Sequence, residues 1–141
     1  MDRFGNYVLS SQVYTNSRDL ARVGLLYLNE GVWNSERILS KKWVEWARRP
    51  AYSTRGIGNT YGGQFWLVPD SRKDLPQDAY STNGAQGQYC VIVPSHDLIV
   101  VRRGLDWRAK YKGLDQWDML AEVLKAFPTP AVPPKKLPPT P

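Results

Sequence analysis

Residues 88–102, with the sequence QYCVIVPSHDLIVVR, contain two apolar runs on either side of a short polar turn. Both runs are rich in β-branched residues, and the Pro, Ser and Asp between them are typical of a chain reversal. The pattern therefore predicts a β-hairpin with strands over 88–93 and 98–102. Because nearly every position of both runs is apolar, we expect the two strands to be central in a sheet that is covered on both faces.

Three helices are predicted around this hairpin from apolar residues that recur at spacings of three and four. The first covers residues 18–28, with Asn16 and Ser17 as candidate N-terminal caps and Gly31 at the left-handed position after its end. The second covers residues 41–48, and the last covers residues 114–127.

One further strand is predicted over residues 61–68, where aromatic residues follow two glycines. The element order helix, helix, strand, hairpin, helix predicts an α+β fold, an antiparallel sheet with packed helices. The length of 141 residues suits one domain, which we assign to residues 1–127. Residues 128–141 contain seven prolines, and we expect them to form a disordered, extended tail.

The composition argues against several classes of function. No apolar run approaches the roughly 20 residues that a membrane-spanning helix needs. The net charge of +6 comes from scattered basic pairs without a nucleic-acid-binding motif, so we expect no nucleic acid partner. The single cysteine, Cys90, and the single histidine, His96, exclude a cysteine-rich or histidine-rich metal site. We expect neither a metal nor a cofactor.

Several residues of chemically versatile types are expected to be structural. Ser95, His96 and Asp97 are consecutive, whereas the members of a catalytic triad come from separate parts of a fold, so we expect these side chains to cap the turn. Cys90 lies among apolar strand residues and is expected to be buried and unreactive. Core packing is expected for five tryptophans: Trp33, Trp43, Trp46, Trp66 and Trp117.

The glycine-rich run over residues 82–88, TNGAQGQ, leads directly into the first hairpin strand. On composition alone, this run is best interpreted as a turn that precedes a buried strand. Glycines beside a strand also allow a ligand to approach the backbone, and free N–H groups there can bind an oxyanion. Both interpretations remain open at this point.

Several phrases of the sequence together resemble one family. They are SSQVYTNSRDLAR (10–22), GLLYLN (24–29), YGGQFW (61–66), GAQGQY (84–89) and DLIVVR (97–102). The chain is similar over residues 5–127, in order, to serine hydrolases related to class C β-lactamases, penicillin-binding proteins and some esterases. The resemblance implies the C-terminal part of a β-lactamase/transpeptidase-like fold. Members of the family are often periplasmic or membrane-associated, but the sequence itself assigns no compartment.

The family uses a serine in an S-x-x-K motif, with the lysine as base, to form an acyl-enzyme on an ester or amide. No serine of this sequence has a lysine three positions later. The resemblance therefore implies that the nucleophile and base precede Met1, that the chain is a fragment, and that it is inactive alone. Tyr14-Thr15-Asn16 matches the family's Y-x-N string, but Asn16 is better explained as a helix cap.

The family's third motif, K-T-G or H-x-G, corresponds to Thr82-Asn83-Gly84, and the N–H of Ala85 is the implied second donor of the oxyanion hole. Thr82 has no cationic or imidazole group, which favours an esterase, an amidase or an inactive relative over a β-lactamase. The implied partner is a small-molecule ester, amide or β-lactam. The alternative is a non-catalytic module that binds cell-wall polymer or a protein partner. We also expect exposed apolar surface and self-association.

Overall fold

The computed structural model describes residues 3–6, 13–54, 58–106 and 113–128. Its helices and strands follow the chain in this order: α1 (Ser17–Leu28), β1 (Val32–Trp33), β2 (Glu36–Arg37), α2 (Lys41–Ala47), β3 (Trp66–Leu67), β4 (Tyr80–Gly84), β5 (Gln88–Val93), β6 (Leu98–Arg102) and α3 (Gln116–Leu124). Short 3₁₀ turns occur at Tyr52–Thr54 and Pro94–His96. None of the described helices is long and apolar enough to cross a membrane. The predicted tail lies almost entirely outside the described residues.

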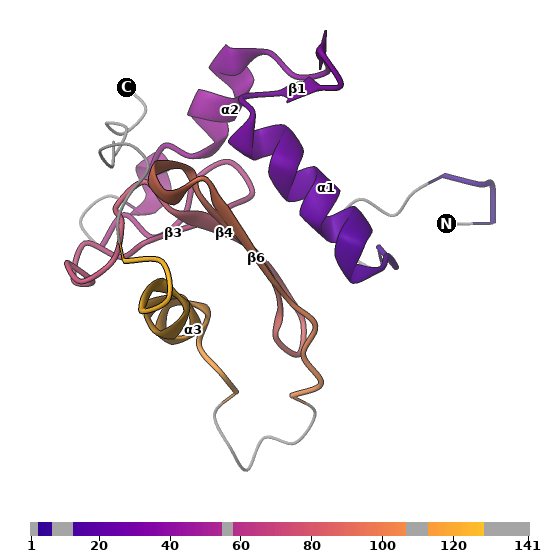
Figure 1. Ribbon diagram of the computed structural model, residues 1–141. Helices are drawn as coiled ribbons and strands as arrows, with labels where there is room; N and C mark the ends of the chain where they lie inside the picture. Colours follow the sequence, from indigo (N-terminus) through magenta and orange to yellow (C-terminus); the bar gives the residue numbers. More distant parts are fainter. Residues whose placement is uncertain (1–2, 7–12, 55–57, 107–112, 129–141) are drawn as a thin grey trace.

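An antiparallel four-stranded sheet in the order β3-β4-β5-β6 forms the centre of the molecule. Helix α1 packs against one face of this sheet and α3 lies on the other, as Figure 1 shows. Strands β1 and β2 form a separate two-stranded hairpin between α1 and α2. The fold is therefore α+β with an antiparallel sheet, as the sequence predicts.

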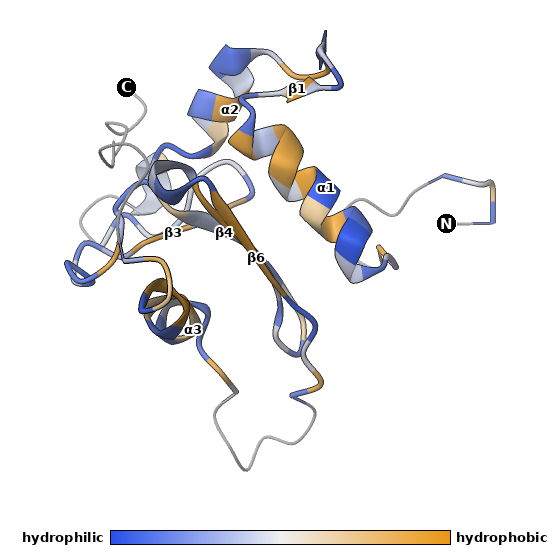
Figure 2. Cartoon of the chain, viewed as in Figure 1, coloured by the Kyte–Doolittle hydropathy of each residue, from blue (hydrophilic) through white to orange (hydrophobic). Residues whose placement is uncertain are grey.

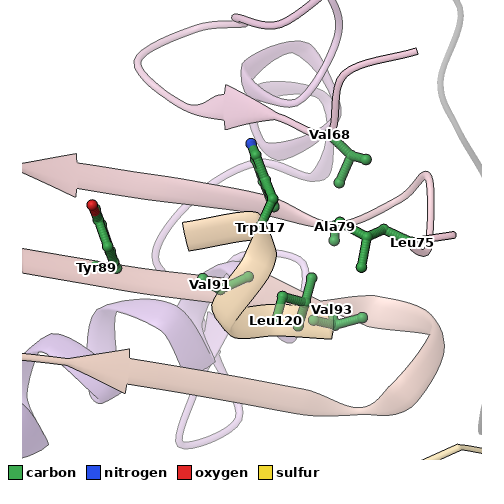
Figure 3. Close-up of a cluster of buried hydrophobic side chains, with 8 residues drawn as sticks. All are labelled: Val68, Leu75, Ala79, Tyr89, Val91, Val93, Trp117 and Leu120. Atoms are coloured by element: carbon green, nitrogen blue, oxygen red, sulfur yellow. The ribbon is translucent and has the colours of Figure 1, made fainter. Parts of the chain in front are cut away.

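Strand β5 supplies side chains to two separate cores because successive residues of a strand point to opposite faces. Tyr89, Val91 and Val93 face α3, where they pack in a cluster with Trp117 and Leu120 (Figure 3). Cys90 and Ile92 face the other way and pack in a cluster that includes partly buried residues of α1. The apolar colouring of Figure 2 accordingly runs along the strands and through both helices.

Helix α1 begins at Ser17, one residue earlier than predicted, with Asn16 as its cap, and it ends at Leu28 as predicted. The Asn16 side chain accepts a hydrogen bond from the N–H of Asp19 at 2.9 Å. The position directly after the C-terminal cap is left-handed, but Glu30 occupies it (φ 52°), and Gly31 follows with φ 88°. Gly31 is required there because a Cβ on it would collide with the carbonyl of Leu39.

The bounds of the other two helices differ slightly from prediction. Helix α2 begins after Ser40, whose hydroxyl accepts a hydrogen bond from the N–H of Trp43 at 3.1 Å, and it ends at Ala47. Helix α3 covers Gln116–Leu124 and not 114–127, because Asp115 caps it by accepting from the N–H groups of Trp117 and Asp118.

The strand predicted over 61–68 is wrong for most of its length. Only Trp66–Leu67 forms a strand, while the preceding residues form a tight turn against the end of α2. Gly63 donates to the carbonyl of Ala47 at 2.7 Å, and a Cβ on Gly62 would lie 2.5 Å from the same oxygen. The two glycines therefore serve close packing on α2.

The predicted hairpin is confirmed, but only β5 is central. Strand β6 lies at the edge of the described sheet, with β5 as its one partner there. The turn predicted before β5 is confined to residues 85–87, because residues 82–84 belong to β4 (Tyr80–Gly84), which pairs with β5 along its whole length. Trp117 is buried, whereas the core positions predicted for Trp43, Trp46 and Trp66 are wrong, since these side chains are more than 40% exposed.

Packing of α3 on the sheet should account for a large share of the stability. Leu120 is fully buried, so Leu120→Ala should lower the free energy of unfolding by about 2–5 kcal/mol, since it removes buried methyl groups and leaves a cavity. Leu114→Ala is the matched control because Leu114 is 45% exposed, and it should cost less than about 1 kcal/mol. Urea denaturation followed by circular dichroism measures both; equal costs would contradict this packing.

Candidate functional site

The four residues singled out by the sequence lie at the end of β4. Thr82, Asn83 and Gly84 are the last three residues of the strand, and Ala85 begins the turn to β5. The structure therefore places them on a strand and at its exit, not in a loop that precedes a strand.

This end of β4 is a free edge of the sheet within the described part of the chain. Strand β5 pairs with all five residues of β4, but β3 pairs only with Tyr80 and Ser81. Beyond Ser81, the backbone groups of β4 that point away from β5 have no described strand opposite them. An exposed strand edge of this kind can bind an extended ligand through main-chain hydrogen bonds.

The exit of the strand is open to solvent. Asn83 and Ala85 are exposed, while Thr82 and Gly84 are half-buried. The N–H of Ala85 donates no backbone hydrogen bond to another described residue. A free N–H beside a glycine that permits close approach is the kind of donor that stabilises a developing oxyanion. We call Thr82–Ala85 the ledge.

The turn that follows the ledge adopts an unusual backbone conformation. Gln86 and Gly87 both have positive φ, 64° and 80°. Arg102 fixes this turn by donating from Nη1 to the carbonyl of Gly87 at 2.8 Å, and a Cβ on Gly87 would collide with the guanidinium. Asp106 also contributes, because its N–H donates to the carbonyl of Gln86 at 3.2 Å.

Arg102 and Asp106 are held together by two parallel hydrogen bonds of 2.9 and 2.7 Å. The hydrogen bond from Arg102 holds the pKa of the Asp106 carboxyl below its usual value. A bidentate pair of this kind has a defined geometry, so the turn after the ledge is fixed by side chains and not by the backbone alone. We call this pair the clamp. No pattern along the sequence predicts this pair.

Arg103 connects the ledge region to the entry of α1. Its guanidinium donates to the side chain of Gln88 at 2.8 Å and to the carbonyl of Thr15. Tyr14, of the Y-x-N string, is almost fully exposed, and Asn16 serves as the cap of α1. Arg103 thus links Thr15 of the Y-x-N string to Gln88, the first residue of β5. The contacts of Asn16 are those of a helix cap.

The turn at the far end of β5 is a structural network, as predicted. Ser95 is fully buried, and its N–H and hydroxyl both donate to the carboxylate of Asp78, at 2.8 and 2.9 Å. His96 Nδ1 lies 3.1 Å from the hydroxyl of Ser95. At about 3.3 Å per residue, the length of β5 separates this network from the ledge, so the two do not form one site.

Cys90 is buried in the cluster below α1, as expected. Burial raises the pKa of its thiol to about 11, which keeps the sulfur protonated at neutral pH. A protonated and buried thiol is a poor nucleophile.

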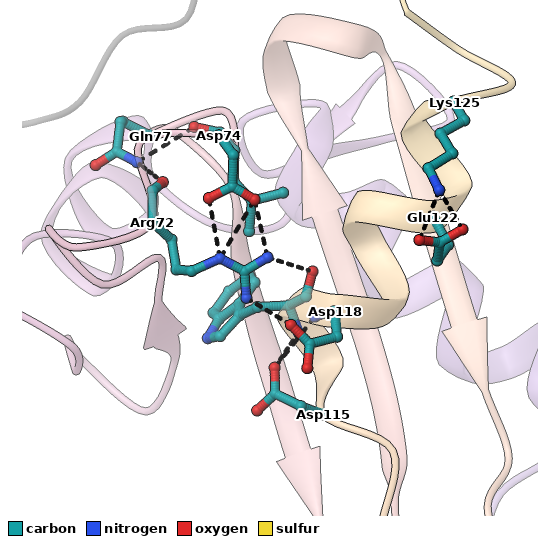
Figure 4. Close-up of polar contacts among 9 residues, drawn as sticks. Arg72, Asp74, Gln77, Asp115, Asp118, Glu122 and Lys125 are labelled. Carbon is teal, nitrogen blue, oxygen red and sulfur yellow. Dashed lines mark hydrogen bonds and ion pairs between the residues drawn. The ribbon is translucent and has the colours of Figure 1, made fainter.

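A second polar cluster ties residues 69–78 to α3 (Figure 4). Arg72 donates to both carboxylate oxygens of Asp74 and, at 2.8 Å, to Asp118. The hydrogen bond from Arg72 lowers the pKa of Asp74. Because these charges are paired with one another, the cluster holds residues 69–78, which precede β4, against α3. No group of three or more potential metal-binding side chains occurs among the described residues.

The fold is similar to that of a solved structure. The chain matches a solved structure of a putative 6-aminohexanoate-dimer hydrolase from Bacillus anthracis with a TM-score of 0.56 and 23% identity, over 80% of this chain and 30% of that one. This similarity is consistent with a β-lactamase-like fold.

Two sequence relatives extend this comparison. The chain is 29% identical over 111 residues to the 6-aminohexanoate-dimer hydrolase of Paenarthrobacter ureafaciens, covering 72% of this chain and 27% of that protein. It is 30% identical over 100 residues to an uncharacterized protein of Alkalihalophilus pseudofirmus, covering 64% and 29%. No model of a known protein family matches. The chain is thus distantly homologous to a hydrolase and spans less than a third of the length of each of these proteins.

Removal of the clamp should loosen the turn after the ledge. In Arg102→Gln, amide hydrogen exchange at Gly87 and Gln88 should accelerate at least about tenfold, because the Gly87 carbonyl loses its donor. Arg22→Gln, which removes an exposed ion pair on α1, is the control and should leave these amides unchanged.

The same variant tests the pKa of the Asp106 carboxyl. In wild type this pKa should lie below 3.8, and it should rise in Arg102→Gln because the hydrogen bond from the guanidinium is lost. An unchanged pKa in an NMR titration would exclude the clamp.

The buried thiol predicts a pH dependence of stability. The pKa of Cys90 is about 11 in the folded protein and near 9 when exposed, so the neutral thiol stabilises the fold below pH 9, and this contribution is lost as the pH rises to 11. The stability difference between wild type and Cys90→Ala should therefore shrink by about 2–3 kcal/mol from pH 8 to pH 11 in denaturant titrations. Rapid modification of the native thiol at pH 8 would contradict its burial.

Proposed function

We propose that this chain supplies one wall of an acyl-transfer site in a serine hydrolase of the β-lactamase-like class, acting on esters or amides. The observation that carries the proposal is the edge of β4 beyond Ser81, where Thr82, Asn83 and Gly84 lead to an Ala85 N–H that donates to no other residue in the described part of the chain. An extended acyl substrate would align along this edge and direct its carbonyl oxygen toward the Ala85 N–H.

The chemistry of the ledge favours contact with an uncharged part of the substrate over contact with the carboxylate of a β-lactam. Thr82 and Asn83 present hydroxyl and amide groups, which hydrogen-bond uncharged partners but do not neutralise a carboxylate as a lysine would. The 6-aminohexanoate dimer named for the relative from Paenarthrobacter ureafaciens is joined by an uncharged linear amide bond, which is the part that would lie on the ledge, while its terminal carboxylate would lie away from Thr82. We therefore place linear amides and simple esters ahead of β-lactams.

The same proposal makes the chain inactive alone. The sequence contains no S-x-x-K pair, and Ser81 and Ser95 are fully buried. In this proposal the nucleophile and base lie outside the 141 residues, and the chain is the C-terminal part of the catalytic domain. Its own contribution is substrate alignment and one donor of the oxyanion hole.

A non-catalytic binding module is the second candidate. Trp43 and Trp46 are about half exposed, and their rings stack with centroids 5.0 Å apart. Exposed aromatic faces on a protein with a net charge of +6 suit an anionic cell-wall polymer or a protein partner. In this case the aromatic pair, not the ledge, would be the binding surface.

The two candidates are separated by NMR titration of the isolated chain. Addition of the 6-aminohexanoate dimer should shift the amides of residues 83–86, because the ligand pairs with the β4 edge. Gly84→Val should abolish these shifts, since its side chain covers the approach, whereas Trp43→Ala should leave them unchanged. The reverse pattern, with cell-wall fragments shifting only the tryptophan indole signals, would establish the binding module instead.

The missing nucleophile is tested separately on the same protein. A chromogenic acetate ester should give neither a burst nor saturable turnover, and a fluorophosphonate probe should label no serine. A covalently labelled serine would refute the proposed division of the active site.

A further inference from the structure

Arg103 carries an exposed positive charge close to the ledge. Its guanidinium donates to two neutral acceptors, the side chain of Gln88 and the carbonyl of Thr15. It forms no ion pair within the described part of the chain, and the carboxylate of Asp106 is held by Arg102 instead. A guanidinium has more N–H donors than these two contacts use. Arg103 therefore keeps both its charge and hydrogen-bond donors for a ligand.

The side chain of Gln88 holds this guanidinium beside the ledge. The Gln88 amide is fixed at both of its atoms, since its oxygen accepts from Arg103 Nε at 2.8 Å and its nitrogen donates to the carbonyl of Gly104. Gln88 lies opposite Gly84 in the ladder between β4 and β5, and a Cβ on Gly84 would lie 3.0 Å from the Cβ of Gln88. Because Gly84 has no side chain, it places nothing between the ledge and the Gln88 amide.

The two faces of the sheet differ in charge at this end. Arg102 lies opposite Tyr89, on the face that packs on α3, and Asp106 neutralises it. Gln88, one residue before Tyr89, lies on the other face, and Arg103 is bound to it there. A positive charge without a carboxylate partner in the described part of the chain thus lies on the α1 face of the sheet. A negatively charged group of a ligand would be attracted to this face.

We propose that Arg103 binds the terminal carboxylate of a linear amide substrate and thereby determines which amides the ledge prefers. The inference rests on the proposed function, in which the carbonyl oxygen of the amide lies at the N–H of Ala85. In the 6-aminohexanoate dimer, named for one relative, the aliphatic chain between the amide and the carboxylate spans about 7 Å when extended. Neighbouring strands are about 4.8 Å apart, so this chain reaches from the ledge to the guanidinium beside Gln88.

The gain in affinity from this contact should be modest. Arginine binds a carboxylate through charge-assisted hydrogen bonds, which favour the charged ligand over a neutral one of the same shape. Because Arg103 is exposed, water and salt screen its charge. We therefore expect the free acid to bind about two- to fivefold more tightly than a neutral analogue at low salt, and we expect this preference to shrink as salt is added.

The experiment is NMR titration of the full chain with two probes, the 6-aminohexanoate dimer and its neutral terminal carboxamide. Both probes should shift the amides of residues 83–86, but only the acid should shift the Nε–H signal of Arg103, a measurement that needs no variant. Arg103→Gln should remove the preference for the acid and change the affinity for the carboxamide less than about twofold. Arg103→Lys should retain part of the preference, because it keeps the charge.

Lys125→Gln is the matched control. It also removes one positive charge, from an exposed side chain at the end of α3, on the opposite side of the sheet from α1. The preference for the acid should therefore persist in this variant. An equal loss of preference in Lys125→Gln and Arg103→Gln would show that the net charge of +6 attracts the acid, and it would overturn the inference.

The outcomes separate this inference from the proposed function. Equal affinity of the wild type for both probes, or an Arg103 signal that the acid does not move, overturns the inference and leaves the proposed function intact, because the ledge still binds the amide. The same holds if a folded Arg103→Gln variant keeps the preference, or if it loses affinity equally for both probes, since Arg103 then only supports the structure. If neither probe shifts residues 83–86, the proposed function fails and the inference fails with it.

Discussion

Burial of β5 on both faces determines the arrangement of the rest of the molecule. Its alternate side chains enter two different cores, so a shift of register by one residue would move Tyr89, Val91 and Val93 from the α3 side to the α1 side. The space beside α1 does not tolerate such an exchange, since a mere Cβ on Gly24 would lie 2.9 Å from the sulfur of Cys90. Both helices and both neighbouring strands are therefore positioned by one six-residue strand.

The position of the ledge depends on β5, because a hydrogen-bond network fixes the chain at each end of this strand. At one end the carboxylate of Asp78 fixes the turn that contains Ser95, and at the other end the Arg102–Asp106 clamp fixes the turn after Ala85. Strand β4 is held between these points by its ladder with β5. In the function proposed above, a backbone donor at Ala85 is useful only if its direction is fixed before the substrate binds, and these two networks are the contacts that would fix it.

The sequence predicts those parts of the structure that depend on local chemistry. The hairpin follows from its apolar runs, and α1 and α2 follow from periodicity and from the caps Asn16 and Ser40. Strand β4 was missed because its polar residues become strand only by pairing with β5, and residues 61–65 were misassigned because the glycines there serve contact with α2. The position of the ledge was indicated by family resemblance, whereas the clamp joins residues that show no pattern along the chain.

The sheet has two open edges in the described part of the chain, and their chemistry differs. At the end of β4 the edge is short, and its side chains, Thr82 and Asn83, are polar, so it can exchange water for the hydrogen bonds of a small ligand at little cost. Along β6 the edge is longer and aliphatic, so removal from water is itself favourable there. The two edges therefore differ in what their burial would gain: hydrogen bonds to polar groups at β4, and removal of aliphatic surface from water at β6.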